Sequence, residues 1–164
     1  MKETDKLDFR DYSKIKGSDR IQINNLLVAI CVPTLTIIIS LGDQILNEAS
    51  IIQLALAIPC LVSSSLAYAK ICYRPEREFS IWDKLGWILH SLGYIMIINS
   101  TALTLYFNEH IFTSWILILI SSVFFITYSV IDIFLKSERK KEKIFKLVFY
   151  LSIIAIGYLI PISL

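Results

Sequence analysis

The polar side chains best suited to do chemistry in this chain lie within one of its apolar stretches. The segment HSLGYIMIINST (90–101) is apolar enough for a lipid bilayer, yet it carries a histidine, an asparagine and hydroxyls. An imidazole in water titrates at about pH 6.5, so His90 could act as a pH-sensitive gate if water reaches it. Every third or fourth residue from Gly86 to Thr104 is small or polar, with Ile97 as the exception, and we name these residues the polar seam: Gly86, His90, Gly93, Ser100 and Thr104.

The polar seam must face another helix or water, because polar groups in hydrocarbon need partners. Two interpretations remain open. Small and hydroxylated residues are the ordinary means by which membrane helices approach and hydrogen-bond one another, which predicts a packing role. Alternatively, several copies of the chain could surround a conduit lined by the seam, with a ring of His90 side chains.

A second polar face is predicted further along the chain. Asp132 precedes Lys136 by four residues, a helical spacing that favours an ion pair near the membrane surface. Alternatively, Asp132 joins Ser121 and Ser129 in a polar face that lines a water-filled entrance.

The residues needed for catalysis or for a cofactor are missing from the sequence pattern. An intramembrane enzyme needs paired carboxylates, a Ser/His or Ser/Lys arrangement or a zinc motif such as HExxH, and none stands here. Cys31, Cys60 and Cys72 show no CxxC spacing, which argues against zinc. We therefore expect neither an enzyme nor a metal or cofactor site.

Membrane helices must position these groups. The chain of 164 residues is 55% hydrophobic and 18% charged, with a mean hydropathy of +0.65. About 20 apolar residues cross a bilayer as a helix. The sequence therefore predicts an all-α integral membrane protein, a bundle of five transmembrane helices in a domain over 21–164, with spans at about 21–41, 51–72, 85–107, 112–135 and 145–164.

Positive charge is confined to alternate connections between these spans. All 16 Lys and Arg residues fall in 1–20, 70–84 and 136–146, and the segments 42–50 and 108–111 have none. Because Lys and Arg accumulate in cytoplasmic loops, we expect a cytoplasmic N-terminus, an outside C-terminus and a multi-pass protein of the inner (plasma) membrane. Residues 1–20 then form a charged cytoplasmic tail.

The second span carries a stripe of small residues, which predicts a helix-packing face at Ala55, Pro59, Ser63 and Ala67.

The last basic segment predicts either lipid contact or the docking of a protein. Six cations in 136–146 create a local positive field, which is expected of any cytoplasmic loop. Nucleic acid is not an expected partner. The residues predicted to contact lipid head groups or a cytosolic partner are Lys136, Arg139, Lys140, Lys141 and Lys143.

Two function classes fit these features. The first is a small homo-oligomeric channel or pore subunit that affects membrane permeability, since such a protein needs no catalytic residues. The alternative is a membrane anchor, sensor or effector subunit, as in a prokaryotic defence or toxin-immunity system. That subunit would act with a cytosolic partner bound to the N-terminal tail and basic loops.

Overall fold

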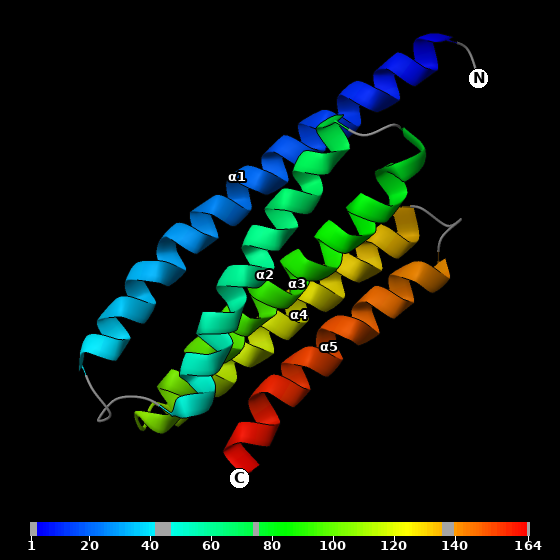
Figure 1. Cartoon of the computed structure of the whole chain (residues 1–164). Coiled ribbons are helices and arrows are strands. Elements are labelled where there is room, and N and C mark those ends of the chain that lie inside the picture. The colour runs from blue at the N-terminus through cyan, green and yellow to red at the C-terminus, as the bar shows by residue number, and fades with distance from the viewer. Residues whose placement is uncertain (1–2, 42–46, 74–75, 136–139, 164) are drawn as a thin grey trace.

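The structure is a bundle of five α-helices (Figure 1). It is a computed structural model that describes residues 3–41, 47–73, 76–135 and 140–163. Each helix contains an apolar stretch of 21 to 30 residues, long enough to cross a membrane. The prediction of an all-helical protein with five candidate spans is confirmed. The helices are α1 (Glu3–Leu41), α2 (Glu48–Tyr73), α3 (Glu76–Phe107), α4 (Ile111–Leu135) and α5 (Lys140–Ser163).

The helices α1 and α3 begin well before the apolar runs from which they were predicted. Helix α1 has 39 residues and is therefore about 60 Å long, roughly twice the thickness of the hydrocarbon core. Gly17 and Ser18 do not interrupt it. Gly17 is buried, and the carbonyl oxygen of Tyr68 lies 3.4 Å from the position that a Cβ atom would take. Gly17 is thus a point of contact between α1 and α2.

The helices follow one another across the bundle, with α1 and α5 at opposite edges (Figure 1). Helix α2 packs between α1 and α3, and α3 also packs against α4 and α5. Helices α1, α3 and α5 begin at one end of the bundle, where α2 and α4 end. Every Lys and Arg of the described residues belongs to a helix segment at this end, which we call the basic end.

The α2–α3 pair is held together by close packing on glycine. The ring of Tyr68 lies 3.0 to 3.2 Å from the Cβ position of Gly86, and Leu61 and the Ala57 carbonyl oxygen lie equally near that of Gly93. A second apolar cluster joins α3 to α4 and α5: Ile95, Ala102, Leu103, Ile118, Ile154 and Tyr158.

The packing face predicted on α2 is only partly buried within this chain. Ala67 is buried, whereas Ala55, Pro59 and Ser63 are exposed, and their packing role stays a prediction. The buried face instead runs through Leu54, Ala57, Leu61, Ser64 and Tyr68. The prediction followed residue size, whereas α2 packs its large side chains against the glycines of α3.

Candidate functional site

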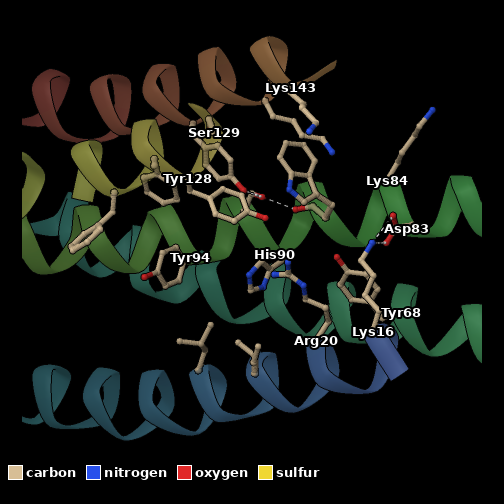
Figure 2. A pocket seen from close by; sticks show the side chains of 18 of the residues that line it. Lys16, Arg20, Tyr68, Asp83, Lys84, His90, Tyr94, Tyr128, Ser129 and Lys143 are labelled. Atoms are coloured by element: carbon tan, nitrogen blue, oxygen red, sulfur yellow. Dashed lines mark hydrogen bonds and ion pairs between the residues drawn. The ribbon is translucent and has the colours of Figure 1, made fainter. Parts of the chain in front are cut away.

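A cavity of about 840 Å³ lies at the basic end between α1 on one side and α4 and α5 on the other (Figure 2). Helix α3 forms its floor, and Tyr68 of α2 contributes at the back. Because an α-helix rises about 1.5 Å per residue, the lining from Lys84 to Ile98 extends about 20 Å along α3. The cavity therefore extends from the basic end along the apolar stretch Glu78–Phe107 of α3.

The end of the cavity nearest the basic end of the bundle is cationic. In Figure 2, Lys16 lies beside Asp83 at this end and Lys84 extends away from both. Arg20 reaches from α1 toward His90, and Lys143 comes from α5. Lys16 Nζ forms an ion pair with Asp83 Oδ1 at 2.8 Å, and both side chains are about 40% exposed. Among the residues that the structure describes, five cationic side chains and one carboxylate line the cavity: Lys16, Arg20, Lys84, Lys143, Lys146 and Asp83.

Aromatic side chains form much of the wall below these charges. The rings of Phe125 and Tyr150 stack with their centroids 4.6 Å apart. Lys146 Nζ lies 4.7 Å from the centroid of the Trp87 ring, a cation–π contact between α5 and α3. The deeper apolar lining is supplied by Leu27, Ile98 and Phe124.

A chain of buried hydrogen bonds joins α1 to α2 and α3 beside the cavity. Asn24 Nδ2 donates to Ser64 Oγ at 3.0 Å, and Ser64 Oγ donates to the Gly86 carbonyl oxygen at 2.7 Å. Asn24 Oδ1 lies 2.6 Å from His90 Nδ1 and is an acceptor, so this ring nitrogen carries the proton. His90, which lines the cavity, is thus tied to α1 through Nδ1.

The rest of the polar seam lies against α2. Ser100 Oγ donates to the Ser50 carbonyl oxygen at 2.8 Å, and Ser50 Oγ lies 2.7 Å from Thr104 Oγ1. Gly86 and Gly93 lie under Tyr68 and Leu61. Within one chain the seam therefore contributes to helix packing, and its role in a conduit between copies stays a prediction.

The structure describes only two of the three side chains in the second predicted polar face. Ser121 and Ser129 both line the cavity. Asp132 belongs to α4, but its side chain lies outside the described residues, so its predicted ion pair stays untested.

The described residues of the predicted basic cluster differ in their position relative to the cavity. Lys143 is buried and lines the cavity, whereas Lys141 is exposed outside it. Lys136 and Arg139 lie outside the described residues, as does the side chain of Lys140. Docking of a cytosolic protein on this segment stays a prediction.

The sequence analysis missed the face of α3 that forms the floor of the cavity. It followed the row of small residues from Gly86, and the neighbouring row carries the lining side chains Lys84, Trp87, Ser91, Tyr94 and Ile98. These positions repeat at the same spacing of three and four residues. A cation followed by aromatic residues along one helix face was the available signal.

Among the residues that the structure describes, no group of three or more His, Cys, Asp or Glu side chains is placed to hold a metal ion.

Comparison with known proteins gives no relative for this chain: no family model, no curated protein and no solved structure matches it.

Proposed function

We propose that this protein binds an amphiphilic ligand of the membrane in the cavity between α1 and the α4–α5 pair. The basic end lies on the cytoplasmic side of the plasma membrane, because every Lys and Arg of the described residues lies there. The ligand enters from the inner leaflet, with its polar part at the membrane surface.

The observation that carries this proposal is the graded lining of the cavity. Cationic side chains stand at one end, and Leu27, Ile98 and Phe124 lie deeper along the span. Its volume of about 840 Å³ falls within the range of small-molecule sites in proteins, about 300 to 1,000 Å³. An amphiphile has the same gradient of polarity, so one molecule could satisfy both ends.

We propose binding rather than catalysis, because polar side chains around the cavity are engaged with one another. His90 Nδ1 pairs with Asn24, and Ser91 Oγ lies 2.9 Å from the hydroxyl of Tyr150. These contacts fix the positions of α1, α3 and α5. The cavity walls are therefore held in place before a ligand arrives, which lowers the entropic cost of binding.

The fluorescence of Trp87 tests this proposal, because its indole lines the cavity. The full chain with Trp82→Phe and Trp115→Phe keeps Trp87 alone and is titrated in phosphatidylcholine nanodiscs with a brominated fatty acid, which quenches indole on contact. We expect saturable quenching. The control keeps only Trp115, which lies on α4 outside the cavity and is 45% exposed, and its quenching should rise without saturation.

A cavity-filling pair sharpens the same experiment. Ser121→Phe places a ring in the cavity and should abolish the saturable component of the quenching. Ser122→Phe adds the same ring to the neighbouring, equally half-buried position outside the lining and should preserve it. Unsaturable quenching of Trp87, or an equal loss in both variants, would overturn the proposal.

A second candidate function is a homo-oligomer that affects membrane permeability. Gln22 and Asn25 are exposed on α1 within its apolar stretch Ile15–Ile37. Amide side chains at such positions hydrogen-bond to neighbouring helices in membranes, which favours a second copy of the chain as the partner.

Liposome efflux with parallel cross-linking tests this second candidate. Asn25→Leu should reduce both the oligomer and the efflux of a small dye. Ser152→Leu makes the same polar-to-apolar change on the exposed face of α5 and should alter neither. A monomeric parent protein that releases no dye would rule this candidate out.

A further inference from the structure

The cationic end of the cavity points to the chemistry of the ligand. Its cations come from three different helices: Arg20 from α1, Lys84 from α3, and Lys143 and Lys146 from α5. We propose that the cavity binds a lipid with a phosphate monoester head group. This inference rests on the proposed function and deepens it.

The charge of the lining selects a ligand with more than one negative charge. Within the described part of the lining, Asp83 is paired with Lys16, and Lys143 and Lys146 have contacts of their own. Arg20 and Lys84 add two further positive charges. A phosphate monoester carries about −1.5 to −2 at pH 7, whereas a carboxylate or a phosphate diester carries about −1. The monoester therefore complements this lining better than a fatty acid or a diester lipid.

The types of cation also fit a phosphate. The guanidinium of Arg20 can donate two parallel hydrogen bonds to phosphate oxygens, and lysine ammonium groups bind phosphate as compact charges. Basic pockets between membrane helices on the cytoplasmic side are typical sites for anionic head groups. Arg20 lies deeper in the cavity than Lys84, so a head group held by the Arg20 guanidinium would lie in the field of the other lining cations.

The apolar depth of the cavity selects a lipid over a free phosphate. Ile98 lies about 20 Å from Lys84 along α3, so a chain attached to the phosphate can extend along Leu27 and Phe124. Each methylene group that leaves water contributes to the affinity. A free phosphate would use only the cationic end.

Titration of the single-Trp87 protein with brominated lipids of identical acyl chains tests the inference. The nanodiscs contain phosphatidylcholine, and the probes are phosphatidic acid, phosphatidylglycerol and diacylglycerol. We expect saturable quenching at the lowest concentration with phosphatidic acid, then phosphatidylglycerol, then diacylglycerol. Inorganic phosphate at concentrations equal to the lipid should leave the bound phosphatidic acid in place.

Two cavity cations provide the variants for this titration. Arg20→Gln and Lys84→Gln should each weaken phosphatidic acid binding about fivefold, with little change for diacylglycerol. Lys70→Gln and Lys141→Gln are the matched controls, because both lysines are exposed at the basic end outside the lining. Each control should change the affinity by less than about twofold, the weak effect expected of a distant, screened charge.

The outcomes separate this inference from the proposed function. Equal affinity for phosphatidic acid and diacylglycerol would overturn the phosphate inference and leave amphiphile binding intact. Equal losses in the cavity variants and the Lys70 and Lys141 controls would overturn it as well, in favour of general surface attraction. Displacement by equal inorganic phosphate would assign the site to a free phosphate. Unsaturable quenching with every lipid would overturn both proposals.

Discussion

The two halves of this bundle use the same kinds of residue for different purposes. In the half away from the basic end, serine, asparagine and tyrosine side chains join α2, α3, α4 and α5 directly. Ser114 Oγ donates to the Ala102 carbonyl oxygen at 2.6 Å and lies 2.6 Å from the Tyr158 hydroxyl. In the basic half, some of these side chains also join helices, as Asn24 and Ser91 do, but Ser121, Ser129 and Tyr128 line a cavity.

The difference follows from the size of the side chains that face one another. Away from the basic end, Gly157 of α5 lies against Asn99 of α3, and Gln53 Nε2 of α2 donates to the Gly157 carbonyl oxygen at 2.7 Å. Small residues bring helices close enough for such bonds. In the basic half, Trp87 and Lys146 stand between α3 and α5. Polar residues in this bundle therefore join helices or line a cavity according to the size of the side chains beside them.

We call the half away from the basic end the closed half. The largest effect is expected there, where the packing of α3 and α5 depends on a glycine. A Cβ atom at Gly157 would collide with the Asn99 amide and meet Gln53 Oε1 at 3.0 Å. Gly157→Val should therefore overpack the site and displace both amides. We expect it to lower the free energy of unfolding by about 3 kcal/mol, measured by reversible unfolding in mixed micelles.

The control for this variant lies two residues earlier on the same helix. Ala155 is exposed, so Ala155→Val should change the free energy of unfolding by less than about 0.5 kcal/mol. If Gly157→Val were as stable as this control, the close packing of α3 and α5 would not hold the closed half together.

A smaller effect is expected from removing a hydroxyl from each half. Ser114→Ala leaves the fully buried Tyr158 hydroxyl without its 2.6 Å partner and should cost about 1 to 2 kcal/mol. Ser121→Ala, at the half-buried cavity wall, should cost less than about 0.5 kcal/mol. The same micelle unfolding experiment measures both. Equal costs would mean that the two halves do not differ in how they use their hydroxyls.

The membrane fold could be predicted from the sequence because hydrocarbon imposes a simple length and polarity rule. Five apolar runs gave five helices, yet α1 begins at Glu3 and α3 at Glu76. Hydropathy marks where a chain can be in lipid, and a helix continues beyond that boundary wherever polar residues allow it. The early starts of α1 and α3 were therefore not visible in the apolar pattern.

The candidate site was harder to predict, because it depends on how distant segments are placed together. Periodicity identified the polar seam, and the structure places Ser100 and Thr104 against Ser50 of α2. The cavity is lined both by Arg20 and by cations of α5 that lie more than a hundred residues away in the chain. No local sequence pattern shows that these residues line one cavity, because the cavity forms only when α1 packs on α2 while α4 and α5 pack on α3.

The smallest expected effect is at the turn that joins α3 to α4 in the closed half. The His110 amide donates to the Leu105 carbonyl oxygen at 2.9 Å and the Glu109 amide donates to that of Tyr106 at 3.2 Å, the hydrogen-bond pattern of a Schellman motif. Glu109 occupies the left-handed position of this motif with φ of 66°, where glycine is usual. Glu109→Gly should therefore raise the free energy of unfolding by about 0.5 to 1 kcal/mol.

Glu48→Gly is the comparison, because it places glycine in the first turn of α2 and should destabilise the protein. Since Glu109 lies far from the cavity, Trp87 quenching should be the same in Glu109→Gly as in the parent, and a change in ligand affinity would show that the two halves are coupled.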